Sequence, residues 1–392
     1  MNVRFVTCFI AVIGLVCAGV KGDVTALPDD PPIAPAAQSA LDMTPFGSEL
    51  AKVGVEVDKL LQNSDDKPTV SMVRNWLINQ DPPTATNPYQ EAYATALNQA
   101  FLNALSQPSA PVTAKINMGI VISSLAGPKA NLAPTVVKLL GDANPAVTLW
   151  GVKAVGAMLP WALQNNDFNV NGTRDAILAA VEAAVSSHSG GPLAGPIADE
   201  AYRAINPKMW RAGSFPTGDA LSALIEANLK LQQNRLTIYF NTGVPAFPQG
   251  DSYPSYLLLS DQVWPVMSPT QQLQAVQQAA NFVSLAGQRF AMANGAVNQD
   301  LIEALQEEGK WITKLGLILS DQQIQDVGTA VNKLSAAMPA GSVKEACDNV
   351  IGALENNPAF SNLTQTPTIG GVAPKSASDN SGGSTPTSEA RP

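Results

Sequence analysis

Histidine and cysteine are scarce in this chain. His188 is its only histidine, and its cysteines are Cys8, Cys17 and Cys347. The sequence has no paired metal-binding histidines and no Cys-x-x-Cys motif, which excludes the common zinc sites and thioredoxin-type redox chemistry. Two of the cysteines fall in a predicted leader, so we expect no internal disulfide, and the stability of the mature chain must come from packing.

Charge is sparse as well, and positive charge most of all. Charged residues make up 14% of the chain, and the formal net charge is −9. An acidic chain without a basic block binds nucleic acid poorly, because phosphate neutralisation needs clustered lysine and arginine. A phosphate-binding glycine loop, a dinucleotide fingerprint and a nucleophile elbow are all missing. We therefore expect no nucleic-acid partner and no cofactor.

The single histidine limits histidine-based catalysis to one position. His188 lies just after a predicted helix, in a run of serines and glycines. Nothing near it in the sequence supplies the rest of a catalytic triad. The simpler interpretation is a residue at the end of a helix, where a cationic side chain complements the helix dipole.

Residues 1–22 are typical of a secretory signal peptide. Arg4 supplies the charged start, an apolar run follows over residues 5–20, and cleavage before Asp23 fits the small residues there. The run is short for a membrane span, which needs about 20 residues. Cys17 raises the alternative of a lipoprotein, although the residues before it fit that processing motif poorly. We expect an exported protein (periplasm, cell envelope or secreted) without a transmembrane span after cleavage.

Two proline-rich segments flank the predicted helical part. Residues 23–48 are rich in proline and lack periodicity, which predicts an extended spacer. Residues 357–392 are rich in proline, serine, glycine and threonine, and too poor in apolar residues to offset the entropy of ordering. We expect this tail to be disordered.

The most regular helical pattern covers residues 144–163. A cap residue, Asn144, is followed by Pro145, which favours the first position of a helix. Apolar residues then recur with a helical period at Val147, Trp150, Val152, Val155, Met158 and Leu159. Similar helices precede and follow it, so residues 49–212 are predicted to form a domain of helical hairpins.

This domain resembles the HEAT-type α-solenoid repeats. The resemblance rests on the start of one helix, with Asp142, Asn144, Pro145, Val147, Val155 and Gly156. It covers about residues 100–207 and departs from the family at Thr148, where an arginine is common. The resemblance implies stacked helical pairs that bury a continuous core.

A second helical block is predicted over residues 213–356. Apolar residues there alternate at spacings of three and four, as antiparallel helices in a bundle require. The pattern is clear in residues 273–290, 301–319 and 324–338. Cys347 lies among apolar residues and is predicted to be a core residue rather than a reactive thiol. The apolar stripes formed by these spacings also allow two copies of the chain to pack together as a homo-oligomer.

A long aromatic loop is predicted at residues 241–268. Long loops inside helical domains are often functional, and aromatic residues with polar tips suit binding surfaces. The candidate binding residues are Phe247, Tyr253, Tyr256 and Trp264. The alternative is a loop that covers the bundle with its rings buried, as most aromatic side chains are.

One segment resembles the first half of an EF-hand calcium loop. Its candidate ligands are Asp167, Asn169, Asn171, Thr173 and Asp175. Leu178 stands where a bidentate Glu or Asp should complete the site, so calcium would bind weakly. The alternative is a polar turn that caps the helix beginning near Thr173.

The sequence therefore predicts an all-α exported protein without a catalytic centre. The leading hypothesis is a scaffold or binding protein that holds a protein or glycan partner through its helical surface and the 241–268 segment. The alternative is a secreted glycan-active hydrolase or lyase that uses carboxylates, because such enzymes need no histidine. An enzyme should bring two acids with perturbed pKa values into one cleft.

Overall fold

The fold was taken from a computed structural model that describes residues 31–127, 130–163, 172–210, 215–242, 248–292, 299–360 and 362–363. Every regular element in these residues is helical, which confirms the predicted all-α class. Within the same residues, each helix is too short or too polar to span a membrane. The predicted signal peptide lies outside the described part of the chain.

The helices follow one another closely along the sequence. In chain order the α-helices are α2 Pro35–Gln38, α3 Gly47–Gln62, α4 Lys67–Asn79, α5 Asn87–Leu105, α6 Val112–Ser124, α7 Ala133–Leu140, α8 Pro145–Ala162, α9 Thr173–Ser187, α10 Ala194–Ile205, α11 Gly218–Thr242, α12 Pro248–Asp251, α13 Tyr253–Leu258, α14 Pro269–Met292, α15 Gln299–Leu319, α16 Gln322–Asn332 and α17 Ala340–Asn356. Short 3-10 turns complete the set: η1 Thr44–Phe46, η2 Ala130–Leu132, η4 Pro207–Met209, η5 Trp264–Val266 and η6 Pro358–Phe360.

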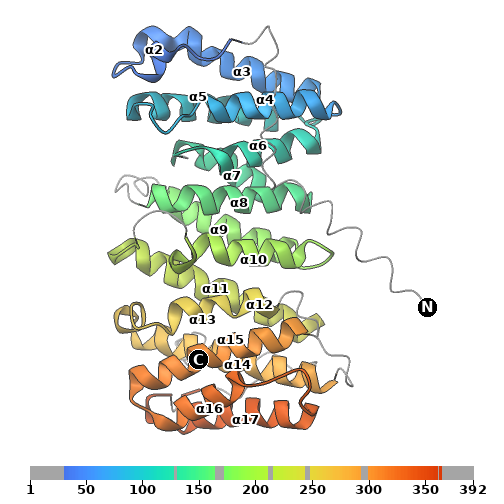
Figure 1. The fold of residues 1–392 in the computed structure, drawn as a ribbon, viewed down its shortest axis with the longest axis vertical. Coiled ribbons are helices and arrows are strands. Elements are labelled where there is room, and N and C mark those ends of the chain that lie inside the picture. Colours follow the sequence, from blue (N-terminus) through green and yellow to red (C-terminus); the bar gives the residue numbers. More distant parts are fainter. Residues whose placement is uncertain are drawn as a thin grey trace, which may run out of the picture.

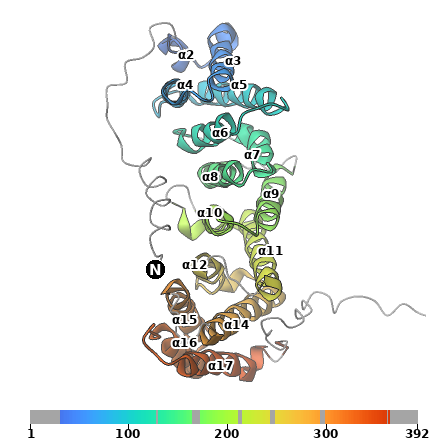
Figure 2. The same ribbon diagram turned by 90° about the vertical axis from the view of Figure 1, so that its right-hand side faces the viewer.

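The helices stack in layers along the long axis, from α2 and α3 at one end to α16 and α17 at the other (Figure 1). In the view turned by 90°, α6, α8 and α10 form one column and α7, α9 and α11 form the other (Figure 2). Neighbours within a column are in contact, as are α8 with α7 and α10 with α9. Assignment of this arrangement to a solenoid or to a bundle stays a prediction.

The N-terminal spacer was predicted wrongly over its second half. Ile33 and Ala37 are fully buried in the first apolar cluster, and the backbone N–H of Ile33 donates to Gln80 Oε1 over 2.9 Å. The N–H of Thr86 donates to the carbonyl of Gln38 over 3.0 Å. Two apolar side chains and these hydrogen bonds are enough to fix a proline-rich segment that has no periodicity of its own.

The start of α8 follows the sequence prediction. The side chain of Asn144 accepts from the backbone N–H of Ala146 over 2.9 Å, and Pro145 occupies the first helical position. Gly151 lies where α8 crosses α7, since a Cβ there would meet Leu140 N at 3.0 Å. The small residue thus lets the two helices approach closely.

The buried apolar residues form two main clusters, and α11 contributes to both. Leu224 and Leu231 belong to the cluster that extends from Ile33, whereas Ile225 and Leu229 belong to the one that extends to Phe360. Adjacent residues such as Leu224 and Ile225 point to different sides of one helix. The predicted domain boundary at 212/213 stays a prediction, and the helix that follows it packs on both sides.

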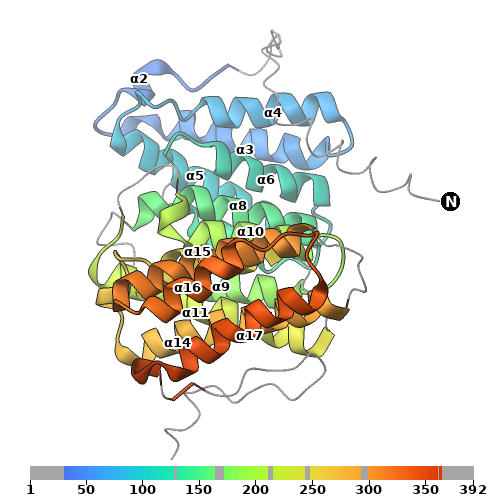
Figure 3. The same cartoon turned by 60° about the horizontal axis from the view of Figure 1, so that its bottom comes forward.

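At the C-terminal end, α15 lies beside α16, and α14 lies beside α17 (Figure 3). The α15–α16 contact is very close. A Cβ on Gly328 would lie 2.5 Å from Thr313 N, and one on Gly309 would lie 2.5 Å from Asn332 N. Glycine at these two positions therefore sets the distance between the helices.

Two C-terminal predictions need correction. The helix predicted over 324–338 ends at Asn332, because the N–H groups of Lys333 and Leu334 donate to carbonyls three residues back and tighten the chain into a turn. The predicted disordered tail begins later than residue 357. Phe360 is 2% exposed and packs edge-on against Trp264, with ring centroids 6.2 Å apart. Most of the remaining tail lies outside the described residues.

Candidate functional site

The segment predicted as a long aromatic loop is largely helical where it is described. It forms α12, α13 and η5, and Leu257, Leu259 and Val263 are fully buried. The prediction failed because these helices are too short to show a clear 3.6-residue period. The segment is thus a structural part of the second apolar cluster and not a free loop.

The four predicted binding residues have different positions. Trp264 is 6% exposed and packs against Phe360, so its ring belongs to the core and the prediction of a binding role is wrong in this structure. Phe247 lies outside the described residues. Tyr253 and Tyr256, both on α13, are only partly buried. These two tyrosines therefore remain candidates.

Tyr256 is part of a cluster built from three elements. Its ring packs on that of Trp311 from α15, with centroids 4.6 Å apart and planes at 36°. Lys208, from η4, places its ammonium 4.7 Å from the centroid of Tyr256 and 6.0 Å from that of Trp311. Both distances allow a cation–π interaction.

The charges around this cluster are not balanced. Lys314 pairs with Asp261 over 3.2 Å, and the Asp261 side chain is 70% exposed. Lys208 is only partly exposed, and no carboxylate in the described part of the chain lies within ion-pair distance of its ammonium. Burial and the nearby charge of Lys314 lower the pKa of Lys208, while Asp261 opposes that effect. Lys208, Tyr256, Asp261, Trp311 and Lys314 are called the Lys208 surface below.

Tyr253 lies in a neighbouring, balanced group. Arg203 donates from Nη2 to the Tyr253 hydroxyl over 2.7 Å and stands 5.1 Å from the ring centroid. Arg203 also pairs with Asp199 over 2.9 Å. Burial and the charge of Asp199 raise the pKa of Tyr253 to about 12. The cation in this group already has a carboxylate, unlike Lys208.

The predicted calcium ligands are only partly described. Asp167, Asn169 and Asn171 lie outside the described residues, whereas Thr173 is the first residue of α9. The carboxylate of Asp175 accepts from Arg174 Nε over 2.8 Å. Across the described ranges, no group of three or more His, Cys, Asp or Glu residues is placed to hold a metal ion. The calcium hypothesis thus stays a prediction, with one ligand already paired to an arginine.

A groove of about 340 Å³ lies between α9 and α11. Its lining includes carboxylates at Asp175, Glu182, Asp219 and Glu226, and cations at Arg174 and Lys230. The charges neutralise one another in part. Arg174 bridges Asp175 and Asp219 over 2.8 and 2.9 Å, and Lys230 pairs with Glu226 over 2.8 Å.

Two other carboxyl groups are fully enclosed. Asp251 accepts from Arg235 Nε over 3.1 Å and from the Tyr202 hydroxyl over 3.0 Å, and each of these side chains is at most 1% exposed. Burial raises the pKa of Asp251, and the guanidinium of Arg235 opposes that rise. This network joins α10, α11 and α12 and has no access to solvent, which marks it as structural.

Glu308, on α15, has 0% exposure. Its Oε1 accepts from the Ser255 hydroxyl over 2.7 Å, and its Oε2 has no hydrogen-bond partner in the described part of the chain. Burial raises the pKa of Glu308 to about 8. A carboxyl in this setting carries its proton at neutral pH.

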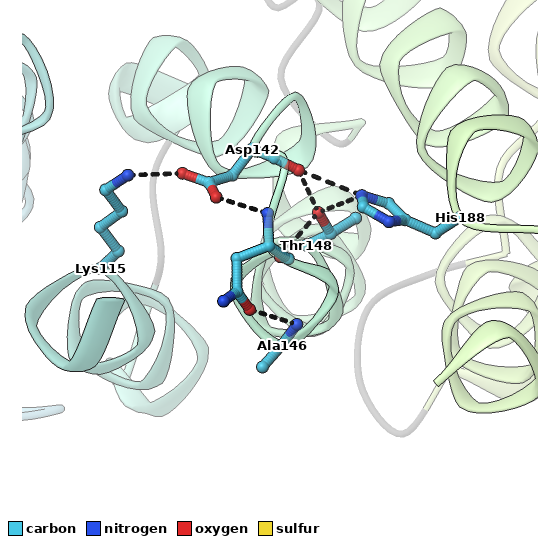
Figure 4. A network of polar contacts seen from close by, with 6 residues as sticks. Lys115, Asp142, Ala146, Thr148 and His188 are labelled. Carbon is cyan, nitrogen blue, oxygen red and sulfur yellow. Dashed lines mark hydrogen bonds and ion pairs between the residues drawn. The ribbon is translucent and has the colours of Figure 1, made fainter. Parts of the chain in front are cut away.

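His188 ends α9 and joins a network at the start of α8 (Figure 4). Its Nε2 lies 3.0 Å from Thr148 Oγ1 and 3.1 Å from the carbonyl oxygen of Asp142. Because a carbonyl only accepts, Nε2 carries the hydrogen in that contact. The carboxylate of Asp142 pairs with Lys115 over 2.8 Å. These contacts tie α6, α8 and α9 together, and among the described residues His188 contacts a hydroxyl and a backbone carbonyl but no carboxylate.

Sequence reasoning missed Lys208, Trp311 and Lys314. They come from elements separated by about a hundred positions, so only the fold brings them to Tyr256. One local signal was available. Trp311 stands next to the apolar seam position Ile312, which places a large aromatic ring at the edge of the buried face.

The sequence matches no protein-family profile, and no curated protein is significantly similar to it. The resemblance to HEAT-type repeats therefore stays a prediction.

Proposed function

We propose that this is an exported, non-catalytic binding or scaffold protein of the cell envelope or exterior. It holds a protein or glycan partner at a surface centred on α13. The observation that carries this proposal is the Lys208 ammonium, which is packed over the Tyr256 and Trp311 rings and, among the described residues, has no carboxylate within ion-pair distance. Such a cation gains from a partner that brings an opposite charge. Export rests on the predicted leader.

The positions of the perturbed acids favour binding over catalysis. A carboxylate enzyme needs two acids with perturbed pKa values at one accessible cleft. In the described part of the chain, burial raises the pKa of two carboxyls, Asp251 and Glu308, which are 1% and 0% exposed and bonded to core partners. They cannot contact a polysaccharide without unpacking α12 and α13.

The alternative is a secreted glycan-active hydrolase or lyase. The groove between α9 and α11 favours it, because four carboxylates line one cavity. Asp175 and Asp219 are held by Arg174, and Glu226 is held by Lys230. Glu182 accepts from Asn234 over 2.8 Å. With each acid engaged by a donor, the groove offers no evident pair of acid and nucleophile.

The test is a pull-down from envelope and culture fractions with the chain 23–392. Removal of residues 241–268 is unsuitable, since that segment supplies core residues such as Leu257. We would compare the wild type with a Lys208→Glu, Lys314→Glu double variant. The matched control is Lys153→Glu, because Lys153 also lies over a tryptophan ring, 4.5 Å from the centroid of Trp150.

A partner retained by the wild type and the control but lost by the double variant would support binding at this surface. Equal retention by all three proteins would refute that location. Turnover of a polysaccharide that is abolished by Asp219→Asn would favour the enzyme instead. Light scattering would test the homo-oligomer, which a clean monomer would refute.

Export is tested separately. Mass spectrometry of the N-terminus after expression in the native host should find Asp23 with a free amine. An acylated Cys17 would replace this with the lipoprotein alternative, and an intact Met1 on intracellular protein would refute export.

A further inference from the structure

The Lys208 surface has the chemical groups that recognise a hydroxylated anion. Two ammonium groups, Lys208 and Lys314, are close enough that the charge of one affects the pKa of the other. The partly exposed rings of Tyr256 and Trp311 lie beside them. Asp261 adds one exposed carboxylate. The surface therefore combines excess positive charge, apolar ring area and a hydrogen-bond acceptor.

The neighbouring described residues do not neutralise the excess positive charge of the Lys208 surface. Arg203 is balanced by Asp199, and Lys310 is balanced by Glu307. Asp261 is shared, since it pairs with Lys314 and also acts on Lys208 through its charge. Among the described residues, two cations and one carboxylate thus leave one net positive charge at the rings.

We propose that the Lys208 surface binds a uronic acid unit of an acidic glycan. The sugar carboxylate pairs with Lys208, and Lys314 supplies a second cation. Sugar hydroxyls donate to Asp261, and the apolar C–H face of the sugar packs on the exposed parts of the two rings. This inference rests on the proposed function and names the class of ligand for it.

The carboxylate of Asp261 determines which class of anionic partner the Lys208 surface favours. A uronic acid has one carboxylate and several hydroxyls, so it satisfies both the cations and Asp261. An acidic peptide or a densely sulfated glycan brings further negative charge against Asp261, which is unfavourable at short range. The observed mixture of charges therefore favours a single carboxylate on a hydroxylated unit.

The test is isothermal titration of the chain 23–392 with polygalacturonate oligomers at low salt. Three further probes are neutral dextran, heparin and polyglutamate. The variants are Lys208→Gln and Asp261→Asn, with Lys153→Gln as the matched control because it removes the other lysine that lies over a tryptophan ring. Circular dichroism of each variant checks folding.

We expect polygalacturonate to bind and dextran not to bind. Lys208→Gln should weaken binding about tenfold, which is the loss of roughly one exposed charge contact, and Lys153→Gln should leave it unchanged. Asp261→Asn should improve binding of heparin and polyglutamate more than that of polygalacturonate.

Failure to bind polygalacturonate would overturn the inference, as would equal binding by the Lys208 and Lys153 variants. Stronger binding of heparin or polyglutamate by the wild type would also overturn it. The broader proposal has a separate outcome. If the envelope pull-down still loses its partner in the double lysine variant, the protein binds at this surface and only the class of ligand is wrong.

Discussion

The enclosed carboxyl of Glu308 leads to a quantitative prediction about pH and stability. In the folded protein its pKa is about 8, against an ordinary value of 4.5. Folded Glu308 therefore keeps a proton that the unfolded chain releases as the pH rises above 4.5. The contribution of Glu308 to stability is greatest at low pH, is lost between pH 4.5 and 8, and is constant above that range.

The magnitude at pH 7 follows from the same values. A pH of 7 lies 7 − 4.5 = 2.5 units above the pKa of Glu308 in the unfolded chain and still below its pKa in the folded protein. At about 1.4 kcal/mol for each unit, the loss relative to low pH is about 3 kcal/mol. This is a large part of the stability of an ordinary domain.

The assay is urea unfolding of the wild type, Glu308→Gln and Glu307→Gln at several values between pH 5 and pH 8. Glutamine cannot ionise, so the free-energy difference between Glu308→Gln and the wild type should shift in favour of the variant by about 3 kcal/mol across this range. If the glutamine amide itself changes the free energy of unfolding, that change is the same at every pH and does not alter the pH dependence of the difference. Glu307 is a matched control, since its side chain is 44% exposed and pairs with Lys310.

Parallel pH profiles for the wild type and Glu308→Gln would refute the reasoning. They would mean that the Glu308 carboxyl titrates at an ordinary pKa and is hydrated in solution. A change of equal size in Glu307→Gln would assign the effect to general surface charge.

Three further predictions follow from close contacts. Gly328→Ala should lower the free energy of unfolding in urea by about 1–3 kcal/mol, because its Cβ would meet the backbone of α15. The control Gly352→Ala has open space around its Cβ and should be neutral or stabilising. Equal effects of the two substitutions would refute the close approach of α15 and α16. Asp251→Asn should cost about 3–5 kcal/mol by removing the carboxylate that pairs with the buried Arg235 guanidinium, and a loss below about 1 kcal/mol would show that the pair is hydrated. Cys347, whose pKa is raised by burial to about 12, should react with a thiol reagent only in denaturant, and rapid labelling of the native chain would contradict its core position.

The long helix α8 could be predicted from the sequence, and the very short helices α12 and α13 could not. The 144–163 pattern gave α8 because its cap, proline and apolar spacing all agree. The segment around α12 and α13 was taken for a loop because prolines interrupt it and neither helix completes two turns. Ile33 and Ala37 were missed because two apolar residues in a proline-rich stretch carry no period.

The candidate site was predictable only in part. Tyr253 and Tyr256 were identified because polar-tipped aromatic residues were concentrated in one segment. Trp264 was selected by the same reasoning, but its side chain is buried. Composition alone does not show which side of a short turn faces the core. Lys208 and Trp311 depend on the packing of η4 and α15 against α13, which no local pattern encodes.

The sharing of α11 between two apolar clusters affects the order of folding during synthesis. As the chain leaves the ribosome, α3 to α10 appear first, and their cluster still lacks the contributions of Leu224 and Leu231 from α11. When α11 arrives it completes that cluster and at the same moment presents Ile225 and Leu229 on its other side. The N-terminal cluster thus provides an apolar surface on which the second half of the chain can assemble as it is synthesised.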